Sequence, residues 1–212
     1  MGPGRWWNER AVPRLVDVAL SERGTGQWRQ RVCESIEGDV LEVGFGSGRN
    51  LPHYGHNVRR VLAVEPADLA WARAQQRIAD FGRPVERVGL DGAHLPVADA
   101  SVDAVVSTWT MCTIPDLAGA LAEVRRVLRP GGQLHFVEHS LAPGSGAVRV
   151  QRALQPIWGR VAGGCHLDRD IPSTITRAGL TMADLRCEYD VDVWPARPFT
   201  WFVCGRAGVQ NA

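Results

Sequence analysis

The sequence contains no lysine, because all 24 of its basic residues are arginines. Enzymes that form a Schiff base or attach pyridoxal phosphate need a lysine amine, so these mechanisms are excluded. The arginines are balanced by 23 acidic residues, which leaves a net charge of +1. This balance excludes a strongly basic nucleic-acid-binding domain, and we expect no nucleic acid among the partners.

Long apolar runs are also missing. No stretch approaches the roughly 18 consecutive apolar residues of a membrane-spanning helix, and the first ten residues lack the apolar segment of a signal peptide. We therefore expect a cytoplasmic protein with no integral membrane segment. The five cysteines form no Cys-x-x-Cys pair, which indicates reduced thiols; a Cys187–Cys204 disulfide is the alternative. They are Cys33, Cys112, Cys165, Cys187 and Cys204.

What is present is a chain of 212 residues, 45% apolar and 22% charged, which is typical of one globular domain. Short runs rich in valine and leucine, with little polar alternation, predict strands buried on both faces at 40–44, 60–65, 84–88, 102–108 and 133–139. Helical spacing between them predicts helices at 50–56, 67–81 and 117–128. This alternation predicts an α/β fold with a doubly wound parallel sheet.

The two ends of the chain differ from this alternating region. Near the start, residues 9–21 predict an amphipathic helix that Gly24 and Gly26 interrupt, and a second helix follows at 27–36. Residues 1–36 therefore form a helical segment ahead of the main domain, 37–212. Near the end, a helix at 173–178 precedes strands at 184–191 and 199–206, which we expect to pair antiparallel at the sheet edge.

A glycine-rich segment closes the first strand. Glu42 is followed by Gly44, Gly46 and Gly48, which allow a tight turn and close approach of a ligand to the backbone. About 20 residues later the second strand ends in Glu65, where an acid can accept both hydroxyls of a ribose. Arg49 stands where a dinucleotide-binding fingerprint has its third glycine, and a nicotinamide oxidoreductase is therefore disfavoured.

The acid two residues before alternating glycines resembles motif I of the class I S-adenosylmethionine-dependent methyltransferases. Further segments resemble the same family in order, at 63–66, 91–96, 100–106 and 123–132. Segments at 137–139, 156–158 and 164–170 resemble its alkyl-thiol S-methyltransferase branch. The resemblance implies a Rossmann-like, seven-stranded sheet, mostly parallel with an antiparallel edge strand and with helices on both faces.

The resemblance also implies S-adenosylmethionine as cofactor, a small, partly apolar acceptor, most simply a thiol, and residues 1–36 as a cap over the active site. Methylation of a quinone, phenol or lipid headgroup at oxygen, nitrogen or carbon is the alternative, as is cofactor binding without turnover. A homodimer is a further expectation. Twelve residues are implied in cofactor binding: Glu42, Gly44, Phe45, Gly46, Gly48, Asn50, Glu65, Pro66, Asp91, Gly92, Ala93 and Thr108.

Within that set, Glu42 is expected to reach the cofactor amino group or, alternatively, to fix the glycine loop, while Glu65 binds ribose and Asp91 binds adenine. On the acceptor side His139 is the expected catalytic base. The acceptor pocket is expected to contain Trp109, His139, Trp158 and His166, with core packing as the alternative for the tryptophans. Of the histidine pairs 53/56 and 135/139, only the first has a spacing that brings two rings together on a helix, and it has no acidic or cysteine partner nearby, so we expect no metal. Cys165 is interpreted as a structural loop residue.

Overall fold

The computed structural model describes residues 22–209 of the chain. Its strands are β1 (Gly38–Val43), β2 (Val58–Val64), β3 (Val85–Gly89), β4 (Val102–Thr108), β5 (Leu128–His139), β6 (Leu180–Tyr189) and β7 (Trp201–Val209). Its helices are α3 (Glu22–Cys33), α4 (Asp68–Phe81), α5 (Leu117–Val127), α6 (Ser145–Val161) and α7 (Ile171–Arg177), with 3-10 turns η2 (Leu51–His53) and η3 (Arg197–Phe199). Within these residues no helix combines the length and the apolar character needed to cross a bilayer.

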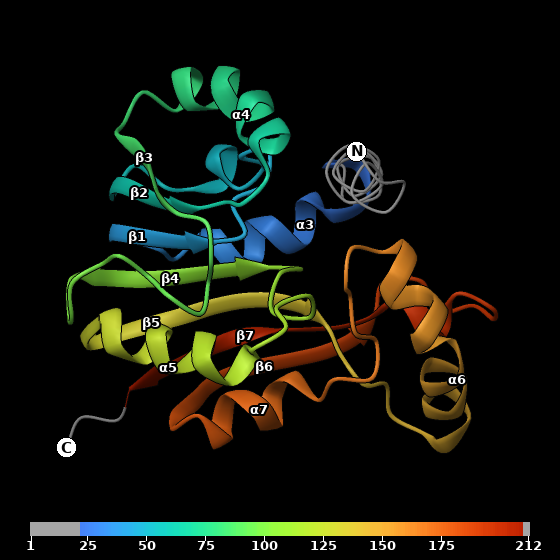
Figure 1. The fold of residues 1–212 in the computed structure, drawn as a ribbon. Helices are drawn as coiled ribbons and strands as arrows, with labels where there is room; N and C mark the ends of the chain where they lie inside the picture. Colours follow the sequence, from blue (N-terminus) through green and yellow to red (C-terminus); the bar gives the residue numbers. More distant parts are fainter. Residues whose placement is uncertain (1–21, 210–212) are drawn as a thin grey trace.

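The strands form one seven-stranded sheet in the order β3-β2-β1-β4-β5-β7-β6 (Figure 1). The pairs among β3, β2, β1, β4 and β5 are parallel, whereas β7 runs antiparallel to both β5 and β6. The predicted α/β sheet, mostly parallel with antiparallel pairing at one edge, is confirmed. Because β1 is parallel to both of its neighbours, β2 and β4, the carboxyl ends of these three strands meet at one edge.

Helices cover both faces of the sheet, as predicted. Successive strand residues point to opposite faces, so Leu41 and Val43 join a core beneath α5 and α7, whereas Val40 joins a second core beneath α3 and α4. The α5 helix begins at Asp116, whose carboxylate accepts the Gly119 N–H, and its apolar stripe is buried against the sheet. Helix α6 lies beyond the carboxyl ends of the strands and packs against η3 (Figure 1).

Three sequence expectations differ from the structure. The predicted break at Gly24 and Gly26 is wrong, because both lie inside α3, where the burial of Trp28 and Val32 outweighs the poor helix propensity of glycine. The predicted helix at 50–56 is reduced to η2. The alternative disulfide does not form, since Cys187 pairs with Val203 and Cys204 with Arg186, which places the two thiols on opposite faces.

Two further differences concern boundaries and a missed element. β5 begins at Leu128 rather than at 133, because α5 passes directly into the strand and Leu128 pairs with Val102. Helix α6 is absent from the sequence predictions, although four of its apolar residues recur at helical spacing: Val150, Leu154, Ile157 and Val161. Pro156, a residue that usually interrupts a helix, lies inside it. The helix predicted at 9–21 lies outside the described residues.

Candidate active site

The glycine loop follows β1 at the carboxyl edge of the sheet. Gly44, Gly46 and Gly48 have φ angles of 77°, 60° and 75°, in the left-handed region that favours glycine. A Cβ on Gly44 would collide with the Thr110 side chain, so this glycine lets the segment after β4 approach the loop. A Cβ on Gly46 would meet no described atom within 4 Å. The Gly46 backbone is therefore the part of the loop that a ligand can approach.

Glu65 lies directly beside this loop, at the end of β2. Its carboxylate accepts the Gly46 N–H at 2.6 Å and the Ala67 N–H at 2.7 Å, and the residue is only 6% exposed. Burial raises the pKa of Glu65, whereas the two N–H groups and the charge of Arg87 lower it. Each carboxylate oxygen keeps a free lone pair. The Glu65 carboxylate is suited to the ribose hydroxyls of the predicted cofactor. The open glycine backbone beside it is suited to the methionine portion.

Glu42 lies inside the protein, on the face of β1 that α3 covers. Its carboxylate accepts the Tyr54 hydroxyl at 2.6 Å and the Asn50 amide at 2.8 Å. Burial raises the pKa of Glu42 to about 7, while the Tyr54 hydrogen bond, the charge of Arg29 and the Asn50 hydrogen bond oppose this rise. This geometry supports the alternative role of fixing the glycine loop, and contact with the cofactor amino group stays a prediction.

Arg29 joins α3 to this buried network. Its guanidinium donates to Asn50 Oδ1 at 2.7 Å and to Thr108 Oγ1 at 3.2 Å, and it lies 5.0 Å from the Trp109 ring. Asn50 also donates to Thr108 Oγ1, at 3.2 Å. The predicted residues Asn50 and Thr108 are thus brought together behind the loop, at the tips of β1 and β4. No local feature distinguishes Arg29 from the other arginines, so the sequence did not reveal it.

The predicted adenine loop reaches the same edge. Asp91 accepts the Ala93 N–H and hydrogen-bonds His94 Nδ1, both at 2.9 Å, and the His94 hydrogen bond lowers the pKa of Asp91. A Cβ on Gly92 would lie 3.0 Å from Val43 Cγ1, so this loop lies over the tip of β1. Two other predicted residues differ in their exposure: Phe45 is buried against Trp71, with ring centroids 5.4 Å apart, whereas Pro66 is exposed.

Glu138 shapes the segment that follows β4, although the sequence did not single it out. This fully buried carboxylate accepts the Ser107 hydroxyl at 2.7 Å and three successive backbone N–H groups at 3.0–3.1 Å, those of Thr110, Met111 and Cys112. Burial raises the pKa of Glu138, and these hydrogen bonds lower it. An acid directly after the apolar pair Phe136 and Val137, near the end of a predicted buried strand, is the signal that would have identified it.

His139 ends β5, where it contacts two cysteines. Its Nδ1 lies 3.9 Å from Cys112 Sγ and 3.8 Å from Cys165 Sγ, and its ring meets Phe202 edge-on at 4.9 Å. Trp109, at the tip of β4, also packs on Phe202 and has a φ of 51°, a strained backbone conformation of the kind that clusters at functional sites. His139 and Trp109 therefore share one aromatic neighbour, as residues of a common site would.

The two other predicted acceptor residues lie around α6. Trp158 packs on Phe199 at 4.8 Å, and its partly buried side chain borders the cluster of Cys112, Cys165 and Leu167. His166 is 41% exposed and lines an open groove of about 470 Å³ with Asp168 and residues of α6. The side chain of His166 thus faces this groove, while its backbone N–H donates to the Cys112 carbonyl at 2.8 Å and so joins the segment after β4.

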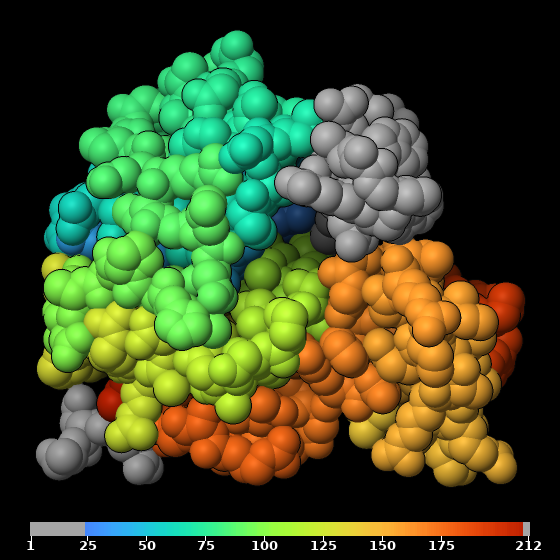
Figure 2. Space-filling model, viewed as in Figure 1, coloured from blue at the N-terminus to red at the C-terminus, as the bar shows by residue number. Residues whose placement is uncertain are grey.

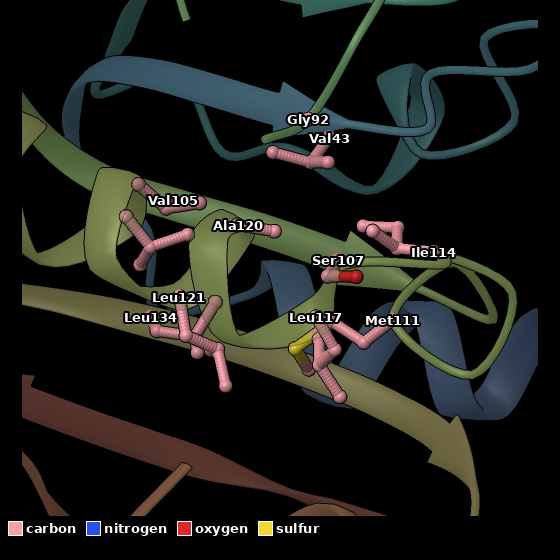
Figure 3. A pocket seen from close by; sticks show the side chains of 11 residues that line it. Val43, Gly92, Val105, Ser107, Met111, Ile114, Leu117, Ala120, Leu121 and Leu134 are labelled. Atoms are coloured by element: carbon pink, nitrogen blue, oxygen red, sulfur yellow. The ribbon is translucent and has the colours of Figure 1, made fainter. Parts of the chain in front are cut away.

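A small apolar cavity lies beneath α5. Figure 3 shows side chains from α5, β1, β4 and β5 converging on it, among them Val43, Val105, Leu121 and Leu134. It leaves only about 10 Å³ of free space, roughly the room of one water, so it cannot hold a nucleoside. In Figure 2 the surface is instead hollowed between the blue-green half of the molecule and the yellow-green segment after β4. In the same view in Figure 1, the arrowheads of β1 and β4 point toward this part of the molecule.

Comparison with known proteins agrees with this arrangement. Residues 41–136 match the family described as Methyltransferase domain. The chain is 34% identical over 177 residues to the thiol S-methyltransferase TMT1B of Rattus norvegicus, covering 81% of this chain and 68% of that protein. It is 36% identical over 172 residues to the same enzyme of Mus musculus, covering 78% and 66%.

A solved structure shows the same fold over the whole chain. This methyltransferase of Haloferax volcanii, in complex with the Trm112 methyltransferase activator, matches with a TM-score of 0.74 at 17% identity, covering 100% of this chain and 99% of that one. The fold, the glycine loop with its acid and the sequence identity agree with one another. The chain therefore belongs to the S-adenosylmethionine-dependent methyltransferases.

Proposed function

We propose that the protein transfers the methyl group of S-adenosylmethionine to the sulfur of a small, partly apolar thiol. The observation that carries this proposal is the extent of the identity to the rat thiol S-methyltransferase, 177 residues against the 96 of the matched domain. The matched domain contains the cofactor-binding half, which enzymes with many acceptors share. Identity that continues outside it includes segments that would surround the acceptor.

The residues proposed to bind S-adenosylmethionine are the glycine-loop backbone and two acidic side chains. Glu65 would accept the ribose hydroxyls, the open backbone at Gly46 would receive the methionine portion, and Asp91 with Ala93 would hold the adenine. When bound, S-adenosylmethionine supplies an electrophilic methyl group on a sulfonium. The protein's contribution is then to orient the acceptor in line with that methyl group and to exclude water.

The acceptor half must make a thiolate, because the thiolate rather than the thiol is the nucleophile. His139 is the residue that we propose prepares the thiol for attack, since it ends β5 beside the tip of β4 and is only half-buried. Trp109 supplies an apolar wall next to it. Trp158 borders the same region from α6, and His166 is proposed to contact the acceptor from the α6 groove.

Three further expectations belong to this proposal. Residues 1–36 cap the active site, which the reach of Arg29 from α3 to Thr108 supports. The cytoplasm is the place of action, which the five free cysteines support. A homodimer is the proposed assembly, and light scattering of the purified protein would measure its mass.

Purified protein incubated with labelled S-adenosylmethionine and a panel of alkyl thiols, phenols and amines tests the proposal. We expect labelled thioether from the thiols, and little product from the other acceptors. Product from phenols or amines alone would contradict the thiol assignment. Tight binding of S-adenosylhomocysteine without product from any acceptor would favour a cofactor-binding protein without turnover.

A further inference from the structure

Two cysteines and one histidine meet at the carboxyl ends of β4 and β5. Cys112 lies in the segment after β4, His139 is the last residue of β5, and Cys165 lies in the segment after α6. The two sulfurs are 3.7 Å apart, and His139 Nδ1 is 3.9 Å from Cys112 Sγ and 3.8 Å from Cys165 Sγ. Among the described residues this is the one group of three or more potential metal ligands found together.

These separations match those that a tetrahedral zinc ion requires. With Zn–S bonds of about 2.3 Å and Zn–N bonds of about 2.0–2.1 Å, two sulfurs lie about 3.8 Å apart and a sulfur and a nitrogen about 3.6 Å apart. Thiolate and imidazole are also the ligand types that zinc prefers. Small rotations of the side chains would bring all three donor atoms to bonding distance.

Contacts outside the three donor atoms also position each ligand. The Cys112 N–H donates to Glu138, and its carbonyl accepts the His166 N–H at 2.8 Å. The Cys165 carbonyl accepts the Gln155 side-chain amide at 3.0 Å. The His139 ring rests edge-on against Phe202. The three donors are therefore positioned by their surroundings, as in a preformed site.

Zinc also suits the chemistry of two neighbouring buried thiols, those of Cys112 and Cys165. Metal binding displaces thiol protons, and a zinc ion would balance the charge of the two thiolates.

We propose that Cys112, His139 and Cys165 bind a zinc ion whose fourth position takes the sulfur of the acceptor thiol. This inference rests on the proposed thiol methylation. Three protein ligands with an open position are the pattern of catalytic rather than structural zinc sites. The cysteines are 1% and 5% exposed, whereas His139 is half-buried, so the cluster is reached from its histidine side.

The role of His139 changes accordingly from base to ligand. The acceptor thiol loses its proton to solvent as its sulfur binds the ion. That sulfur then forms the new carbon–sulfur bond with the methyl group, and the methyl–sulfonium bond breaks with its electron pair staying on the departing sulfur. The products are a thioether and S-adenosylhomocysteine, and the weakly bound thioether leaves the ion.

Metal content is the first test. Untagged protein, dialysed against zinc and then against metal-free buffer, is expected to retain about one zinc ion per chain by elemental analysis. Cys112→Ser and Cys165→Ser should lose most of it, whereas Cys187→Ser, an exposed cysteine, and His166→Ala, the neighbouring histidine, should keep it. Circular dichroism checks that each variant is folded. Absence of retained zinc, or retention unchanged in both serine variants, would overturn the site.

Cobalt substitution is the second test, and it separates the site from the reaction. The Co²⁺ protein should show thiolate-to-cobalt charge transfer, and an added alkyl thiol should change its ligand-field bands. An unchanged spectrum would contradict the open position. The zinc-loaded protein is assayed for methylation in parallel. If thiol changes the cobalt spectrum while the zinc-loaded protein methylates only phenols or amines, the metal site is supported and the proposed thiol methylation is contradicted.

Discussion

The Glu65 carboxylate accepts the Gly46 N–H at 2.6 Å, and this hydrogen bond joins the end of β2 to the turn that follows β1. The two groups come from neighbouring parallel strands, whose carboxyl ends meet at the same sheet edge. The acid is thereby fixed in position before a ligand arrives, next to backbone that no described side chain covers. Cofactor affinity should depend on this pair.

Replacing Glu65 by alanine should weaken S-adenosylhomocysteine binding by one to two orders of magnitude, because each lost hydrogen bond to a charged group costs about 1.5–3 kcal/mol. Titration calorimetry measures the effect. Glu86→Ala, an exposed acid on neighbouring β3, is the matched control and should bind as the unmodified protein does. Equal affinity of the Glu65 variant would remove this residue from the site.

Alanine at Gly44 and at Gly46 should have different consequences. Both positions have positive φ, which costs about 1–2 kcal/mol for alanine. At Gly44 the new methyl group also collides with Thr110, so the free energy of unfolding should fall further. At Gly46 it enters open space and should chiefly reduce cofactor affinity. Urea denaturation and calorimetry on both variants check this, and equal stability losses would contradict it.

Glu42→Gln should change how stability depends on pH. Burial raises the pKa of Glu42 from 4.5 to about 7, so between these values the folded state binds more protons than the unfolded state. The Glu42 contribution to the free energy of unfolding therefore falls as pH rises through this window, by about 3 kcal/mol in total. The glutamine variant lacks this fall, so its stability relative to the unmodified protein should improve with pH. A pH-independent difference would show that Glu42 is not perturbed.

Glu138→Ala should destabilise the segment after β4. The substitution leaves the Ser107 hydroxyl and three backbone N–H groups without their buried acceptor, and one such group alone costs about 1–3 kcal/mol. Urea denaturation should show a loss of several times the value found for Glu34→Ala, an exposed control. Hydrogen exchange at 110–112 should also accelerate, and unchanged exchange there would refute the positioning role of Glu138.

The sheet could be predicted from the sequence because its strands are buried on both faces. Such strands form continuous valine- and leucine-rich runs, as at 102–108, where the predicted and observed bounds coincide. The α6 helix was missed for a different reason: its apolar residues recur at helical spacing, but Pro156 interrupts the pattern, and the helix packs beyond the sheet edge. Packing of α3 likewise overrode the helix-breaking tendency of Gly24 and Gly26.

In the candidate site, too, the residues that could be predicted are those whose arrangement is local in the sequence. The glycine loop and Glu65 could be found because their spacing is local and follows from the strand–turn–helix unit. The contacts of Arg29 with Thr108, and of Cys112 with Cys165, join residues 79 and 53 positions apart. No sequence pattern encodes such pairs, so the three-residue cluster around His139 required the folded chain.

A crystal structure of the protein with S-adenosylhomocysteine would test the central claim most directly. We predict that both ribose hydroxyls lie about 3 Å from the Glu65 carboxylate, with the adenine beside Asp91 and Ala93 and the sulfur near the tips of β4 and β5. An adenosine bound elsewhere, or a Glu65 carboxylate that contacts only the backbone N–H groups of Gly46 and Ala67 in the complex, would contradict the account.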